Sequence, residues 1–270
     1  MNEFFSIMSY GFMQKAFVVG LLVSLCAALL GVSLVLKRYS MIGDGLSHVA
    51  FGAMGIASAF GLAPLKAAVP IVIACAFLLL RLSEKSRLRG DGAIALISSS
   101  AMAIGVVSVS LSSGMNTDLM NYMFGSILSV SDSDAVLSIL LSCIVIISFI
   151  LLYPRIFAVT FDETFSKSSG VKTNFFNSAV AVLTAITVVL GMRIMGTLLI
   201  SSLIIFPSAT AMTVCRNFKS TVIISGVFSI ICFALGMILS VVLGIPTGAC
   251  VVCVNAAVFG IFKLFTVIRK

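Results

Sequence analysis

Charged residues interrupt the apolar stretches of this chain at intervals that suit helices crossing a lipid bilayer. Most runs approach the roughly 20 helical residues that a hydrocarbon core requires. They cover residues 16–36, from within 44–48 to about 62, 65–80, 92–111, 135–153, 175–192, 194–214, 221–243 and 249–267, and Pro154 ends the fifth. The alternating pattern of a membrane barrel is absent. We therefore predict an all-α polytopic membrane protein with nine spans. Eight is the alternative, because the second run is short enough to be re-entrant and almost nothing separates 175–192 from 194–214.

The composition supports this class and excludes a soluble domain. Hydrophobic residues make up 60% of the chain, charged residues 10%, and the mean hydropathy is +1.24. The net charge is +8, but no basic patch is interleaved with aromatic residues, so we predict no nucleic-acid partner. We expect residues 1–270 to form a single transmembrane domain in contact with membrane lipid.

The basic residues give one consistent orientation if all nine runs span. One side then carries Lys37, Arg38, Arg81, Lys85, Arg87, Arg89, Lys167, Lys172, Arg216, Lys219, Arg269 and Lys270, and the other carries Asp118, Asp132 and Asp134. Basic residues are retained in cytoplasmic loops. We therefore expect a cytoplasmic C-terminus and an external N-terminus.

The only histidine of the chain, His48, follows Asp44 by four residues. On a helix the two side chains share one face, about 6 Å apart along the axis. A carboxylate and an imidazole at this spacing form half of a site for a divalent transition metal. The alternative is an aspartate that orients or neutralises a lone histidine at a membrane interface. Small residues fill the run that follows, and the pairs Gly55 with Ala59 and Ala53 with Ala57 predict a closely packed inner helix.

A short amphiphilic segment, at about residues 160–172, lies between the fifth and sixth runs. Asp162 and Glu163 suit the first turn of a short helix, Lys167 its later turn, and Gly170 its C-cap. Phe161 and Phe165 would be exposed on the cytoplasmic side. We interpret the segment either as a docking element for another protein or as a plain solvated connector.

Four stretches of the chain resemble the membrane subunits of bacterial metal-ion ABC importers, the zinc, manganese and iron permeases of the ABC-3 family. Residues 37–48 resemble the family's basic lead into G-D-x-x-S-H, and residues 122–125 its Y-L-F-G element. Residues 161–171 resemble its coupling segment, and 196–211 its G-x-L-L…P-A-A-T-A run. The four lie in the family's order and spacing across most of the chain.

This resemblance implies a type II ABC importer-like permease in the bacterial cell membrane, with a cytoplasmic coupling helix. The implied partners are a second copy of the chain, cytoplasmic ATPase subunits and an extracytoplasmic metal-binding lipoprotein. Asp44 and His48 match the family's metal-contacting pair. Phe161, Asp162, Glu163, Phe165, Lys167 and Gly170 match residues of the coupling segment. The implied cargo is Zn²⁺ or Mn²⁺, with iron possible and no permanently bound cofactor.

The sequence also departs from its relatives. Met54 differs beyond the motif, and no histidine lies near Asp118 or in the C-terminal tail, where some relatives carry one. The residues after His48 are more similar to those of the zinc-type members than to the Leu-Pro-Gly of manganese-type members. We therefore expect zinc before manganese, with further ligands from Asp118, a second protomer or solvent.

Two other functions remain open at the level of the residues. The chain has no G-x-x-x-x-G-K-[ST] motif, so we expect it not to hydrolyse ATP itself and active transport to need an ATPase partner. A proton-coupled secondary metal carrier could instead use Asp44 and His48 as a proton relay. An intramembrane protease is disfavoured, because there is one histidine and no H-E-x-x-H motif.

Overall fold

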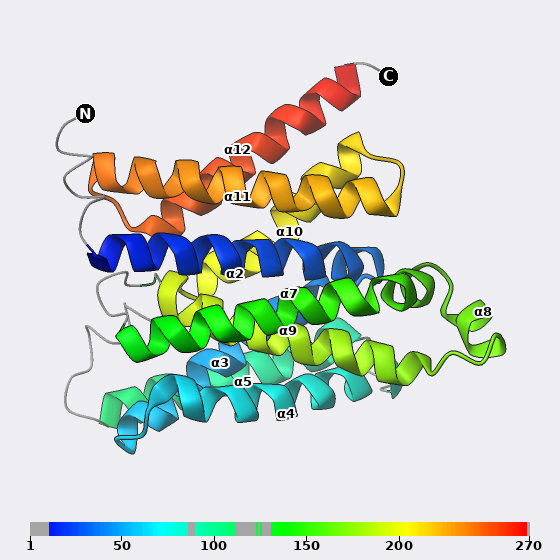
Figure 1. The fold of residues 1–270 in the computed structure, drawn as a ribbon. Helices are drawn as coiled ribbons and strands as arrows, with labels where there is room; N and C mark the ends of the chain where they lie inside the picture. The colour runs from blue at the N-terminus through cyan, green and yellow to red at the C-terminus, as the bar shows by residue number, and fades with distance from the viewer. Residues whose placement is uncertain (1–10, 86–89, 112–122, 124, 126–130, 269–270) are drawn as a thin grey trace.

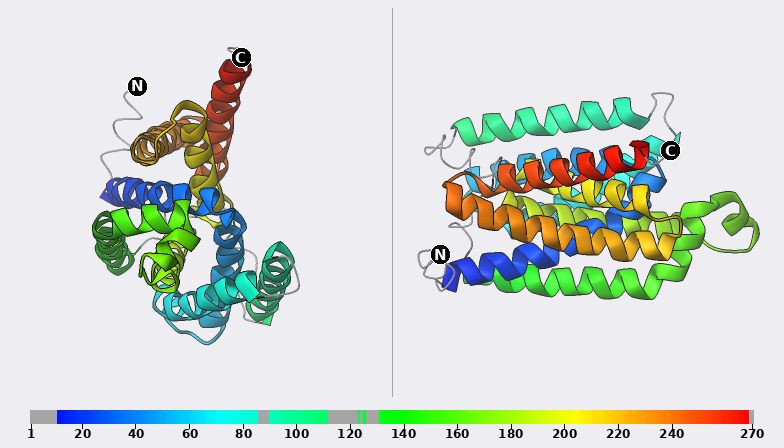
Figure 2. Two further views of the ribbon diagram at one scale, coloured as in Figure 1. Left: turned by 90° about the vertical axis from the view of Figure 1, so that its right-hand side faces the viewer. Right: turned by 90° about the horizontal axis from the view of Figure 1, so that it is seen from above.

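The described part of the chain folds entirely into helices in a computed structural model, which describes residues 11–85, 90–111, 123, 125 and 131–268. Most of the long helices run in roughly the same direction, while α12 crosses them obliquely (Figures 1 and 2). They are α2 (Gly11–Leu36), α3 (Ser40–Ala59), α4 (Pro64–Lys85), α5 (Gly90–Leu111), α7 (Asp132–Phe161), α8 (Glu163–Ser168), α9 (Thr173–Met195), α10 (Thr197–Val214), α11 (Phe218–Leu243) and α12 (Thr247–Ile268).

Eight of the described helices are long and apolar enough to cross a membrane. They include both α9 and α10, which are joined through Gly196 with its positive φ of 83°. The remaining long helix is α3, which has 20 residues and carries Asp44 and His48. The predicted range of eight to nine spans therefore agrees with the structure.

Two predicted boundaries are wrong. The fifth run does not end at Pro154, because α7 continues through that proline to Phe161. A proline removes only one intrahelical hydrogen bond, which a long helix in a membrane tolerates. The sixth and seventh runs do not meet at Arg193, because that residue lies within α9. The helix α9 ends at Met195, and Gly196 separates it from α10.

The two ends of the bundle carry different charge. The turn after α2, the segment with α8 and the connection from α10 to α11 lie together at one end (Figure 1). They bring Lys37, Arg38, Lys167, Lys172, Arg216 and Lys219 to that end. At the opposite end Asp132 pairs with Lys15 at 2.5 Å and Asp134 with Arg193 at 3.5 Å. Asp118, Arg87, Arg89, Arg269 and Lys270 lie outside the described residues.

The α3 helix packs most extensively against α5. A Cβ added to Gly52 would lie 2.4 Å from the carbonyl oxygen of Ala101, and one on Gly55 would lie 2.9 Å from that of Gly105. These glycines therefore let the two backbones approach closely, as the small residues of this run predict. The predicted pairing of Gly55 with Ala59 is wrong, because Ala59 is exposed at the end of the helix.

We predict that Gly52→Ala lowers the free energy of unfolding by about 1–3 kcal/mol, because the new methyl group forces α3 away from α5. The control is Gly260→Ala on α12, where nothing lies within 4 Å of the added carbon. That change removes a helical glycine and should be neutral or stabilising by up to about 1 kcal/mol. Unfolding in detergent measures both, and equal effects would contradict the proposed close approach.

Candidate functional site

The turn that leads into α3 places Asp44 and His48. The amide of Arg38 donates to the carbonyl of Val35 at 3.1 Å, and that of Tyr39 donates to Leu34 at 2.8 Å. This paired arrangement reverses the chain directly after α2. Arg38 takes a φ of 61°, a left-handed conformation that glycine more often occupies here. The turn fixes where α3 begins relative to α2, and so where its second turn lies.

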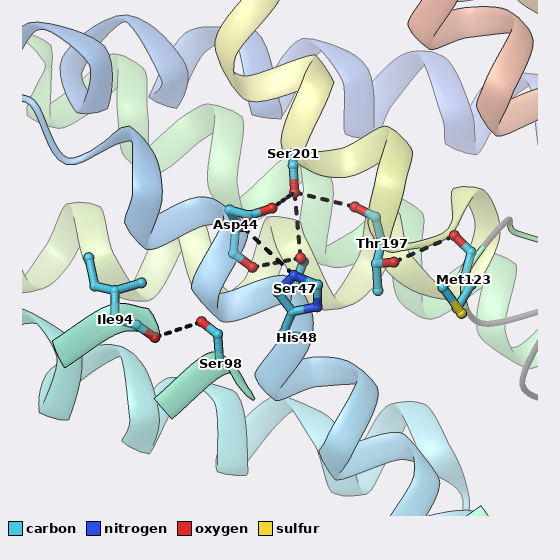
Figure 3. A network of polar contacts seen from close by, with 8 residues as sticks. All are labelled: Asp44, Ser47, His48, Ile94, Ser98, Met123, Thr197 and Ser201. Atoms are coloured by element: carbon cyan, nitrogen blue, oxygen red, sulfur yellow. Dashed lines mark hydrogen bonds and ion pairs between the residues drawn. The ribbon is translucent and has the colours of Figure 1, made fainter. Parts of the chain in front are cut away.

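Asp44 and His48 meet on one face of α3, as their spacing predicts. Asp44 Oδ2 lies 3.7 Å from His48 Nε2, and their side chains are 41% and 29% exposed (Figure 3). Both atoms could bind one divalent ion at about 2.1 Å. The angle between them at the ion would then be roughly 120°, which is compatible with a four-coordinate site. The pair can therefore supply two ligands to one ion, and its role as a metal site stays a prediction.

Two hydroxyl groups bond to Asp44, one to its carboxylate and one to its backbone. Ser201 of α10 donates to Asp44 Oδ1 at 2.9 Å, and Ser47 donates to the backbone carbonyl of Asp44 at 2.7 Å (Figure 3). The two hydroxyl oxygens lie 3.5 Å apart. The carboxylate is thus held on one oxygen, while its other oxygen faces the imidazole.

Three of the stretches singled out in the sequence converge here. Thr197 follows Gly196, and its hydroxyl donates to the carbonyl of Met123 at 3.5 Å (Figure 3). Gly125 has a φ of 79°, and a Cβ there would lie 2.4 Å from the backbone of Met195. Met123 and Gly125 therefore lie against the junction of α9 and α10. Sequence reasoning assigned no role to Ser201 or Thr197, and their only signal was membership of the 196–211 run.

Within the described residues no group of three or more histidine, cysteine, aspartate or glutamate side chains could hold a metal ion. Asp44 and His48 consequently form a two-ligand arrangement in the described part of the chain. Asp118, a predicted candidate for a further ligand, lies outside the described residues. An incomplete set of protein ligands suits an ion that is passed on better than one held permanently.

The segment after α7 forms the predicted short helix, α8. Asp162 is its N-cap, and its side chain accepts from the amide of Phe165 at 2.8 Å. Ser169 is the C-cap, so the prediction for Gly170 is wrong by one residue. Gly170 follows the cap with a φ of 80°, and the amide of Val171 donates to Ser166 at 3.0 Å in the arrangement that ends many helices.

Phe161 and Phe165 are 62% and 67% exposed, as expected. The α8 segment projects beyond the end of the bundle (Figures 1 and 2). Phe161 also lies against Phe157 and Phe218, with ring centroids 4.9 and 6.0 Å apart. Phe165 therefore offers the more available apolar group for a partner.

Glu163 joins α8 to the turn before α3. Its carboxylate lies 2.9 Å from Lys167 Nζ and 3.6 Å from Lys37 Nζ, and it accepts from Asn177 at 3.4 Å. Lys37 also donates to the side-chain oxygen of Asn177 on α9. Partial burial favours the neutral form of Glu163, but the hydrogen bonds from Lys167 and Asn177 and the two lysine charges outweigh it, so the pKa of Glu163 lies below its ordinary value of 4.5.

Comparison with known proteins gives consistent matches over nearly the whole chain. The profile of the ABC 3 transport family matches residues 9–266. The manganese transport system membrane protein MntC of Listeria monocytogenes is 27% identical over 96% of this chain and 92% of its own length. A probable iron transport system membrane protein of Haemophilus influenzae is 29% identical over 97% of this chain and 96% of its own length.

Among solved structures, PsaBC from Streptococcus pneumoniae in complex with Fab matches with a TM-score of 0.87 and 26% identity. The match covers 97% of this chain and 94% of that chain. The predicted all-α, importer-like fold and the predicted multi-pass location in a bacterial membrane are confirmed by these matches together with the eight apolar helices.

The Glu163 ion pairs predict a pH-dependent contribution to stability. A carboxylate with a lowered pKa stabilises the fold above its ordinary pKa, and this contribution is lost as the pH falls through the folded-state value. We expect the free energy of unfolding of wild type to exceed that of Glu163→Gln by at most about 1 kcal/mol at pH 7. The difference should disappear as the pH falls from 4.5 through the lower folded-state pKa of Glu163. Thermal unfolding of both proteins between pH 7 and 3 measures it. A difference that stays constant over this range would contradict the account.

Proposed function

The chain belongs to the ABC 3 transport family as the permease of a metal ABC importer, and we propose that Asp44 and His48 contact a divalent transition metal during its passage. The observation that carries the proposal is the half-exposed Asp44–His48 pair on an otherwise apolar helix. Ionisable groups within membrane helices are costly unless they face a partner or a solvated path. A carboxylate and an imidazole with an open side suit an ion in transit.

Manganese and zinc are the first two candidates for the cargo. Aspartate oxygen, imidazole nitrogen and serine hydroxyl can bind either ion. Within the described residues no cysteine joins Asp44 and His48 in a metal-binding group, so no thiolate there favours a softer metal. The Listeria relative is named for manganese, and the Haemophilus relative is named as a probable iron transporter. These names favour manganese over the zinc that the residues after His48 suggest. Competition between the ions for one site decides among them.

We propose that ATP hydrolysis resides in a separate cytoplasmic subunit that docks on α8, and that an extracytoplasmic binding protein delivers the ion. The exposed Phe165 on a capped, projecting helix supports the first part. A second copy of the chain would cover the open side of the Asp44–His48 pair, which lies 41% and 29% exposed in one chain. The family membership leaves the proton-coupled secondary carrier without support.

Asp44→Ala and His48→Ala should each abolish ATP-driven uptake, because each removes one of the two ligands. Uptake of radioactive Mn²⁺ or Zn²⁺ by vesicles that contain the permease, its ATPase and its binding protein measures the effect. The variants should elute from size exclusion like wild type, which separates lost transport from lost folding. Wild-type uptake by either variant at limiting metal would refute the assignment. Uptake by the wild type that needs a proton gradient but no ATP would favour a carrier.

Phe165→Ala should weaken assembly with the ATPase by about tenfold or more, because an exposed aromatic anchor at the centre of an interface is commonly worth at least 1–2 kcal/mol. The control is Phe60→Ala, which removes the same ring from a 77% exposed position at the opposite end of α3. Co-purification and permease-stimulated ATP hydrolysis measure the coupling. Equal assembly of both variants would argue that α8 is a plain connector.

A further inference from the structure

We propose that Ser201 is the positioning residue of the transport site, which sets the orientation of the Asp44 carboxylate for the metal. This inference rests on the proposed function and deepens it, because it concerns how one of the two ligands is held. Ser201 lies on α10, whereas Asp44 and His48 lie on α3. The geometry therefore makes the metal site depend on the contact between these two helices.

The hydrogen bond of Ser201 differs from those of three serines on α5. Ser98, Ser100 and Ser108 donate to the carbonyl four residues earlier at 2.7 to 2.8 Å. A hydrogen bond from the hydroxyl to a backbone carbonyl of the same helix is the ordinary arrangement for a serine within a helix. The corresponding distance from Ser201 to the carbonyl of Thr197 is 3.3 Å, while its short bond of 2.9 Å goes to Asp44 Oδ1. The hydroxyl is thus turned away from its own backbone and toward the carboxylate.

Because of this bond, the two carboxylate oxygens have different partners. Oδ1 accepts from Ser201, and Oδ2 points at His48 Nε2 from 3.7 Å (Figure 3). Rotation of the carboxylate about its last bond would exchange or misplace the two oxygens, and the hydrogen bond opposes that rotation. A hydrogen-bond partner of this kind fixes ligand orientation and typically accounts for a factor of about 10–100 in metal affinity.

The link extends from the carboxylate to Met123. The hydroxyl of Ser201 also lies 3.3 Å from the carbonyl of Thr197, and the hydroxyl of Thr197 donates to Met123. A displacement of the first turns of α10 relative to α3 would separate Ser201 from Asp44 and return its hydroxyl to Thr197. The orientation of the ligand, and with it the affinity, would then change with the position of α10.

The test compares Ser201→Thr with Ser201→Val, which have nearly the same shape and differ in the hydroxyl group. The purified chain assembled with its ATPase is titrated with Mn²⁺, and free ion is followed by electron paramagnetic resonance. We expect Ser201→Thr to bind Mn²⁺ within about threefold of wild type, and Ser201→Val and Ser201→Ala to bind about 10–100-fold more weakly. The visible absorption of bound Co²⁺ should change in the valine and alanine variants and return in the threonine variant.

The matched control is Ser202→Ala. Ser202 is the neighbouring residue on α10, is buried, and donates to the carbonyl of Leu199 at 2.9 Å instead of to the site. We expect this variant to bind Mn²⁺ like wild type. If Ser201→Ala and Ser202→Ala lose the same amount of Mn²⁺ affinity, the loss comes from disturbed packing of α10, and the proposal is overturned.

The failure of this inference is distinguishable from the failure of the proposed function. If Asp44→Ala loses Mn²⁺ binding while Ser201→Val and Ser201→Thr bind equally, the site stands and the role of Ser201 is refuted. If Asp44→Ala binds like wild type, the carboxylate is not a ligand and both proposals fall. A selective loss in Ser201→Val supports both.

Discussion

A carboxylate on an inner helix of a membrane protein needs polar partners, and the arrangement around Asp44 supplies them. Burying such a group without partners would cost several kcal/mol or convert it to the neutral acid. Here the partners are a hydroxyl from another helix and an imidazole on the same helix, at 2.9 and 3.7 Å. None of them carries a permanent positive charge, so the carboxylate keeps its ability to attract a cation.

Contacts from several parts of the fold hold this one group in place. Gly52 and Gly55 seat α3 closely against α5, and the turn through Arg38 fixes where α3 begins. On the other side Ser201 reaches the carboxylate from α10. The same turn carries Lys37, which lies 3.6 Å from Glu163 on α8. A movement of α8 would therefore act on the turn directly before α3, the helix that bears the proposed ligands. This contact gives the proposed coupling segment a physical route to the site.

Sequence reasoning predicts the elements better than their contacts. The apolar runs locate every long helix in the described part of the chain, since charge-free stretches of this length have few other stable forms in a bilayer. The run that ends at Pro154 misplaces the end of α7, because a membrane helix tolerates a proline that would end many soluble ones. The meeting of Asp44 with His48 follows from a local spacing, and so does the capping of α8 by Asp162. The contact of Asp44 with Ser201 joins residues 157 positions apart, and only the packing of α3 against α10 creates it.

X-ray absorption spectroscopy of the metal-loaded protein tests the central claim most directly. His48 is the only histidine of the chain, so any imidazole that the permease supplies to the ion must come from it or from the same residue of a second copy. The account predicts the multiple-scattering pattern of imidazole together with oxygen ligands for Mn²⁺ or Zn²⁺ bound to the permease with its ATPase, and the loss of the imidazole pattern when the same complex carries His48→Ala. A tightly bound ion with an all-oxygen or sulfur shell and no imidazole signal would contradict it.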